Sequence, residues 1–228
     1  MKNLQISDLL KKTERFLPEN AGTSRRKNID KNCYVYHVIT NTWSKRKLFY
    51  HDVAKYRHDL LCKLCNKNGI TILFQTTMGN HSHEVFLTPE WETLALVVRS
   101  LNINVSKYVR KHYAERTKNG KKVFDSEIVY IPVKDITYLF FLGKYIFDNP
   151  KYLVEEGGMA PFSCFWMFEK GHFVTGYDSE IYAKLFDLQP AEIFRIYSTM
   201  TKEEVMEYAK KQFSAWTEED NLKLFTRT

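Results

Sequence analysis

The stretch ITILFQTTMGNHSHEVF, residues 70–86, predicts two strands joined by a turn and decides how the rest of the chain is interpreted. Residues 70–76 are rich in β-branched and aromatic side chains, and residues 78–80 supply turn-forming side chains. The second strand holds His81 and His83. Side chains alternate along a strand, so both histidines project from one face of the predicted sheet. Two adjacent imidazoles suggest a metal-binding pair.

Strand and helix patterns alternate on both sides of this hairpin. Apolar periodicity predicts strands over 33–40 and 127–133, and helices over 52–66, 90–113 and 135–149, with Pro150 ending the last of them. This order predicts an α+β fold: a ferredoxin-like antiparallel sheet with helices on one face. Short helices are expected over 181–186, 190–199 and 201–213, with a capping box at Thr201 and Glu204. They form a C-terminal helical extension.

Three parts of the chain follow from this pattern. Residues 1–30 are polar and basic and are expected to form an N-terminal arm, residues 31–172 the α+β core, and residues 173–228 the helical extension. The extension has no evident basic recognition face, which favours a packing role over a DNA-binding helix-turn-helix.

Composition narrows the class of protein. The 228 residues are 44% hydrophobic, enough for a substantial core, and the net charge of +7 with a pI near 9.1 favours a polyanionic partner such as nucleic acid. Four cysteines are too few for a disulfide scaffold, and neither a signal peptide nor a membrane span is indicated. A cytoplasmic protein is expected.

A tyrosine and an asparagine stand one helical turn apart at the end of the third predicted helix. Tyr145 and Asn149 are four residues apart and share a helix face. Imidazoles and an amide oxygen can hold a divalent ion that polarises a phosphodiester. A tyrosine hydroxyl beside such a phosphate can attack it and form a covalent phosphotyrosine.

Each residue also has an ordinary structural interpretation. A His-x-His pair is common in strands, Tyr145 lies in a helix rich in aromatic residues where packing is the usual role, and Asn149 before Pro150 is typical of a helix end. Cys62 and Cys65 form a single CxxC without a second pair, which favours buried thiols over a zinc site. The joint occurrence of the histidine pair and the tyrosine segment, in this order, favours a catalytic site.

The two segments NHSH (residues 80–83) and YIFDNP (residues 145–150) resemble the HUH single-tyrosine transposases, most closely the REP-associated branch, over about residues 31–168. The resemblance implies a DNA transposase: an endonuclease and strand transferase acting on single-stranded or hairpin DNA through a 5′-phosphotyrosine. By position it implies Tyr145 as nucleophile, and His81, His83 and Asn149 as ligands of Mg²⁺ or Mn²⁺. Ser82 departs from the family pattern, which usually has a bulky hydrophobic residue between the histidines.

Basic and aromatic residues near these segments are candidates for DNA contacts, with a solvated helix face as the alternative. The basic candidates are Arg99, Lys107, Arg110, Lys111, Lys121, Lys122 and Lys144. Tyr108, Tyr113 and Trp91 are candidates for stacking on unpaired bases.

Two other functions remain open on the sequence. One is a domesticated protein that binds a nucleic-acid hairpin without cutting it. The other is a replication-initiator or relaxase-type nicking enzyme with the same chemistry. A monomer or a homodimer is expected.

Overall fold

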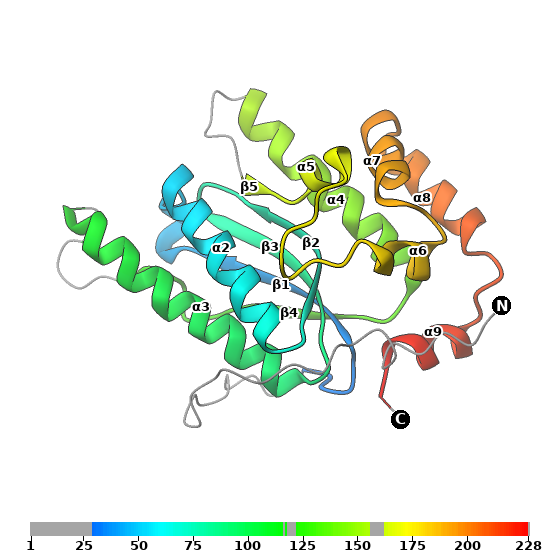
Figure 1. Cartoon of the computed structure of the whole chain (residues 1–228), viewed down its shortest axis with the longest axis horizontal. Helices are drawn as coiled ribbons and strands as arrows, with labels where there is room; N and C mark the ends of the chain where they lie inside the picture. Colours follow the sequence, from blue (N-terminus) through cyan, green and yellow to red (C-terminus); the bar gives the residue numbers. More distant parts are fainter. Residues whose placement is uncertain (1–28, 116, 118–121, 156–161, 228) are drawn as a thin grey trace.

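A five-stranded antiparallel sheet forms the centre of the protein in a computed structural model that describes residues 29–115, 117, 122–155 and 162–227 (Figure 1). The strand order is β4-β1-β3-β2-β5. The strands are β1 (Val35–Asn41), β2 (Thr71–Thr77), β3 (His81–Leu87), β4 (Val129–Val133) and β5 (Phe162–Ser163). Nearly all of the expected arm, residues 1–28, lies outside the described residues.

Two helices cover one face of the sheet, as Figure 1 shows. They are α2 (His51–Lys67) and α3 (Trp91–His112), and they pack against each other. Apolar residues at helical spacing, such as Leu94, Val98 and Leu101, are buried with Tyr36 and Phe86 of the strands. A short 3-10 turn, η1 (Trp43–Lys45), links β1 to this layer.

The opposite face is covered by α4 (Ile136–Glu155) and by the C-terminal extension (Figure 1). The further helices are α5 (Phe165–Lys170), α6 (Glu180–Phe186), α7 (Pro190–Thr199), α8 (Lys202–Gln212) and α9 (Glu218–Phe225). Their side chains share one hydrophobic core with the sheet, in which Phe74 of β2 contacts aromatic rings of α5, α6 and α7. The extension is therefore continuous with the core packing.

Gly143 lets α4 approach this aromatic core closely. A Cβ at this position would lie 2.4 Å from Tyr197 Oη and 2.7 Å from Phe74 Cζ. Tyr197 Oη is itself fixed, because it donates a hydrogen bond to Phe140 O at 2.6 Å. The helix that carries Tyr145 is thus seated against the core through a position that has no side chain.

The last described residues return to the first strand. Tyr34 N donates to Phe225 O at 2.8 Å, and Cys33 forms an isolated antiparallel bridge with Thr226. Arg227 Nε donates to Pro89 O at 3.0 Å. These contacts attach α9 to the same end of the sheet as the start of β1.

The structure confirms the α+β class and the predicted order of strands and helices, including α6, α7, α8 and the capping box. In that box Thr201 N donates to Glu204 Oε2 at 2.8 Å and Glu204 N to Thr201 Oγ1 at 3.2 Å. No helix within the described ranges is long and apolar enough to cross a membrane.

The expected end of the third helix is wrong. Helix α4 continues through Pro150 to Glu155, so Asn149 lies inside the helix rather than at its end. A proline removes one backbone donor and disfavours a helical residue before it, but residues after it can keep helical backbone angles. The packing of α4 against α8 and β2 stabilises the helix against that local cost.

Candidate active site

Strand β3 places His81 and His83 side by side on the face that α4 covers. Their ring centroids are 5.0 Å apart, and Val85 and Leu87, which follow at the same alternation, are buried in the core on that face. Burial of Val85 and Leu87 therefore fixes the register of β3, and with it the projection of both imidazoles from this face.

Asn80 sets the tautomer of His81. The Asn80 amide nitrogen donates to Lys45 O at 3.3 Å, so its Oδ1 faces the imidazole, 2.7 Å from His81 Nδ1. An amide oxygen only accepts hydrogen bonds, so His81 Nδ1 carries the proton. The lone pair of His81 is left on Nε2, where it is available to a metal ion.

A third histidine, His37 of β1, contacts the pair. His37 Nε2 lies 2.9 Å from His83 Nδ1, and the two rings stack with centroids 5.2 Å apart. When His83 is the donor in this bond, its Nε2 keeps the lone pair that a metal ligand needs. The sequence offers no partner for His37, because only the pairing of Ile39 with His83 shows that the two histidines share a face.

Burial keeps these imidazoles neutral. Desolvation lowers the pKa of His83 to about 3 and that of His37 to about 4, and also lowers the pKa of His81. Neutral imidazole is the form that binds a metal ion. The donor set therefore fits a divalent cation.

Tyr145 projects from α4 towards the histidines. Its ring stands edge-on to His83 with centroids 5.6 Å apart and planes at 85°, and the residue is 36% exposed. Within the described structure its hydroxyl makes no hydrogen bond. Lys202 Nζ of α8 lies 5.4 Å from the centroid of the same ring. The phenol is thus accessible, unbonded and next to a positive charge.

Asn149 lies one turn after Tyr145 and is half-buried. Its Nδ2 is buried and has no hydrogen-bond partner among the described residues. No group of three or more His, Cys, Asp or Glu side chains in the described ranges could hold a metal ion. A metal site here would consist of two histidines and this amide.

The other face of β3 is closed by an ion pair. Arg57 Nη1 of α2 donates to Glu84 Oε1 at 2.5 Å, and both side chains are 1% exposed. Burial raises the pKa of Glu84, and the Arg57 guanidinium opposes that shift. Ser82, between the two histidines, is buried on this face as well.

The predicted DNA-contact residues separate into three groups. Exposed side chains are Arg99, Lys107, Arg110, Lys111 and Lys122, whereas Lys121 lies outside the described residues. Lys144 is instead 3% exposed, and its ammonium donates to Asp148 Oδ1 at 2.9 Å and Tyr197 O at 2.8 Å. It is engaged inside the protein and does not reach the surface.

Among the predicted stacking residues, Trp91 is also buried, at 3% exposed. It packs against Tyr36 and Tyr130 and is not available to a base. Tyr108 and Tyr113 bond to Asp52 at 3.4 and 2.5 Å.

Lys122 and Trp43 lie at the same end of the sheet as the histidines. Asn41 pairs with His81, and the next residue, Thr42, bridges to Phe124. Lys122 Nζ, two residues earlier, lies 5.3 Å from the centroid of the exposed Trp43 ring. A cationic and aromatic surface therefore adjoins the site.

Cys62 and Cys65 are both buried free thiols, as the sequence favoured. Burial raises the pKa of Cys62 to about 12, and its Sγ lies 3.5 Å from His58 Nε2.

Comparisons with known proteins give one family match and two similar solved structures. The family model described as transposase, IS200-like, matches residues 30–149. A solved REP-associated tyrosine transposase bound to a REP hairpin is 15% identical, with a TM-score of 0.49, over 69% of this chain and 92% of that chain. A protein from Deinococcus radiodurans R1 assigned as a candidate transposase is 16% identical, with a TM-score of 0.39, over 59% and 99% of the two chains. No curated protein sequence matches.

Proposed function

The chain belongs to the IS200-like transposase family, and on that premise we propose that it is a single-tyrosine HUH transposase that cuts and rejoins single-stranded DNA with Tyr145. The observation that supports this most directly is the contact between the unbonded phenol of Tyr145 and the ring of His83. A tyrosine kept for packing would bury its hydroxyl against a partner, as Tyr197 and Tyr182 do.

The proposed reaction is a transesterification at phosphorus. Tyr145 Oη attacks the scissile phosphate, a new O–P bond forms, and the bond from phosphorus to the 3′ oxygen breaks. The phenol loses its proton to solvent, and the departing oxygen gains one and leaves as a free 3′ hydroxyl. The 5′ phosphate stays on the tyrosine. Another 3′ hydroxyl reverses the same exchange when strands are rejoined, so no nucleotide cofactor is consumed.

A Mg²⁺ or Mn²⁺ ion fits the residues next to Tyr145. His81 Nε2 and His83 Nε2 would bind it with the Asn149 amide, and His37 would hold His83 in the required tautomer. When bound, the ion supplies Lewis-acid polarisation of the scissile phosphate.

The substrate we propose is single-stranded or hairpin DNA. The exposed cations Arg99, Lys107, Arg110 and Lys111 and the pair of Lys122 with Trp43 would bind its backbone phosphates. Lys202, over the Tyr145 ring, would place a further positive charge beside the phosphate under attack.

We also propose that residues 31–172 act as the catalytic core and residues 173–228 as a support for the tyrosine helix. Helix α8 packs on α4 and brings Lys202 to the nucleophile. Tyr145 contacts His83 of its own chain, which supports a site completed within one subunit.

The experiment that tests the proposal is the capture of a covalent adduct. The protein is incubated with labelled hairpin DNA from the sequence flanking its gene and with Mn²⁺, and the products are separated on a denaturing SDS gel. We expect a labelled protein band in the wild type and none with Tyr145→Phe. The thermal unfolding midpoint should be unchanged in this variant, because the lost hydroxyl has no partner within the described structure.

Other outcomes would contradict the proposal. Cleavage that persists in Tyr145→Phe would mean that an activated water molecule is the nucleophile. Binding of the hairpin without any adduct would favour the non-cleaving alternative. Restoration of the adduct on mixing Tyr145→Phe with His83→Ala would show that the tyrosine serves a partner subunit.

A further inference from the structure

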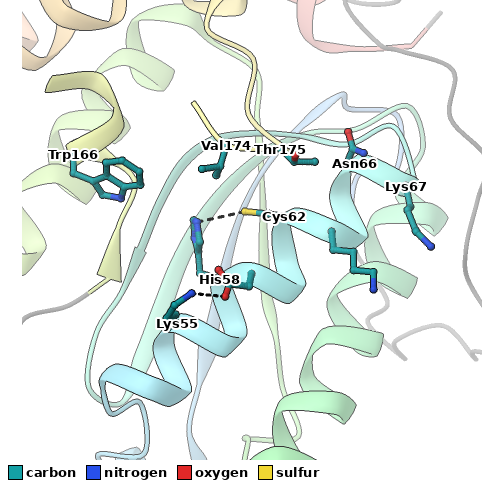
Figure 2. A pocket seen from close by; sticks show the side chains of 10 residues that line it. Lys55, His58, Cys62, Asn66, Lys67, Trp166, Val174 and Thr175 are labelled. Carbon is teal, nitrogen blue, oxygen red and sulfur yellow. Dashed lines mark hydrogen bonds and ion pairs between the residues drawn. The ribbon is translucent and has the colours of Figure 1, made fainter. Parts of the chain in front are cut away.

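A cavity of about 540 Å³ that the histidines do not line lies between α2 and the segment that follows β5 (Figure 2). Helix α2 forms one wall through residues spaced three, four or seven apart, from Lys55 to Lys67. Trp166 of α5, Val174 and Thr175 form the other wall. Figure 2 shows Trp166 and Lys67 at opposite ends of the cavity.

The two walls are fixed to each other and to the sheet. Gly176 packs so closely on α2 that a Cβ would lie 3.0 Å from Cys62 O, and its φ of +94° is one that glycine readily adopts. Ile72 N donates to Gly176 O at 2.8 Å, which ties the segment to β2. The Tyr177 ring stacks on His58, with centroids 6.0 Å apart. The cavity is therefore preformed.

One wall presents an indole to solvent. Trp166 is 42% exposed, whereas its neighbours Phe165, Met167 and Phe168 are buried in the core. Helix α5 is thus oriented by the other three side chains, and the tryptophan is directed outwards next to the half-exposed Val174. A large exposed indole at a preformed cavity offers a flat apolar surface to a planar ligand.

The opposite wall is cationic. Lys55, Lys63 and Lys67 line it, and one acidic residue, Asp59, neutralises Lys55 at 2.7 Å. Lys63 is exposed and has no hydrogen-bond or ion-pair partner among the described residues. A flat aromatic surface facing ammonium groups suits a base and its phosphate.

The cavity adjoins the active-site end of the sheet. Thr76 of β2 pairs with His83 on one side and with Ser163 of β5 on the other. Ser163 therefore lies about two strand spacings, or about 10 Å, from His83. Trp166 follows three residues later. Because β5 is only two residues long and forms the edge of the sheet, a DNA strand leaving the site can pass round this edge.

We propose that this cavity binds an unpaired nucleotide of the substrate strand, with the base stacked on Trp166 and a phosphate at Lys63. The proposal rests on the proposed function, because it takes single-stranded DNA as the substrate. It assigns to α2 and α5 the recognition of the single strand that flanks the hairpin, separate from the cutting of the phosphodiester.

The test compares two labelled DNA hairpins, one blunt and one with a single-stranded tail of about eight nucleotides. Trp166→Ala should weaken binding of the tailed hairpin about tenfold, in line with the loss of one base stack, and leave binding of the blunt hairpin unchanged. Trp166→Phe, which keeps an aromatic ring, should retain most of the affinity. Leu222→Ala on α9, which removes a side chain that is more exposed, is the matched control and should bind both hairpins normally.

A second readout locates the base directly. Tails that carry 5-iododeoxyuridine should photocrosslink to the peptide containing Trp166. Lys63→Ala should reduce the slope of log affinity against log salt concentration by about one, the value expected for one lost phosphate contact. Crosslinking to Tyr108 or Tyr113 instead would overturn the proposal, as would an equal effect of Trp166→Ala on both hairpins or no effect on either.

The failure of the proposed function has a different signature. If the wild type binds neither hairpin, both proposals fall together. If it binds the tailed hairpin and forms the tyrosine adduct while Trp166→Ala behaves as wild type, only the cavity proposal is overturned.

Discussion

The two faces of strand β3 bury polar side chains in opposite ways. On the α2 face, Glu84 is closed by Arg57, and both charges are sealed from solvent. On the α4 face, His81 and His83 are neutral, each has one ring nitrogen engaged, and a tyrosine with an unbonded hydroxyl stands beside them. His83 is buried almost as deeply as Glu84, but the rings of His83 and His81 keep lone pairs that a metal ion can bind.

The difference shows how a buried polar residue can be interpreted. A charge whose partner saturates it contributes to the architecture, and its loss affects folding. A polar group that keeps an unused donor or acceptor costs stability and points to a ligand. Adjacent residues of one strand, His83 and Glu84, illustrate the two cases.

The largest expected effect comes from removing the ion pair on the α2 face of β3. Arg57→Ala should destabilise the protein by about 3–5 kcal/mol, because Glu84 is left as an uncompensated buried carboxylate. Urea unfolding followed by circular dichroism measures this loss. The double variant Arg57→Met/Glu84→Leu should recover much of it, and Lys107→Ala on the exposed side of α3 should change little. A loss below about 1 kcal/mol for Arg57→Ala would refute the idea that this face is structural.

The packing of the tyrosine helix should give the next largest effect. Gly143→Ala should cost up to about 3 kcal/mol, because its methyl group overlaps Tyr197 Oη and Phe74. Covalent adduct formation should fall with it, since α4 carries Tyr145. The double variant Gly143→Ala/Tyr197→Phe lacks the closest overlapping atom, Tyr197 Oη. Its loss of stability should therefore be smaller than the sum of the losses in the two single variants. Strict additivity would mean that the overlap is relieved elsewhere.

On the α4 face of the sheet, His37 should influence metal binding more than folding. His37→Leu removes the partner of His83 Nδ1 and should weaken Mn²⁺ binding about 10- to 100-fold. His37→Gln offers an oxygen acceptor and should restore part of the affinity. Free Mn²⁺ counted by electron paramagnetic resonance gives the result without any DNA. Equal affinities in the wild type and His37→Leu would show that His83 needs no such partner.

The smallest effect is expected at Lys202. Lys202→Met keeps the aliphatic stem but removes the charge over the Tyr145 ring, and should slow adduct formation about two- to fivefold. Lys202→Arg should stay close to wild type. Lys210→Met on the same helix, where the lysine pairs with Glu207, is the control and should have no effect. A slowing by Lys210→Met of the same size would point to a general electrostatic effect.

Local patterns in the sequence were sufficient for the fold class and for the order of most strands and helices. The period of apolar residues identified the strands of the hairpin and helices α2, α3 and α4, because each element buries one continuous face. Strand β5 escaped prediction because two residues show no periodicity, and the end of α4 was misplaced because the proline rule is local while the packing of α4 on α8 is not.

The site was only partly accessible from the sequence. His81, His83 and Tyr145 stand in recognisable local motifs, and the structure brings them together. His37 and Lys202 reach them from β1 and α8, across sequence separations that no local pattern encodes. Lys144 and Trp91 were predicted to contact DNA at the surface because of their residue types. Tertiary packing instead buries both side chains.

The return of the chain to β1 has a consequence for synthesis on the ribosome. Phe225 O accepts the hydrogen bond from Tyr34 N, and the rings of α7 and α8 cover Phe140, so the tyrosine helix has no complete cover until the extension has been translated. A nascent chain stalled before α7 would expose the apolar side of α4 while its histidine strand was already formed. The packing that holds Tyr145 beside His83 is therefore complete only after α7 and α8 have been translated.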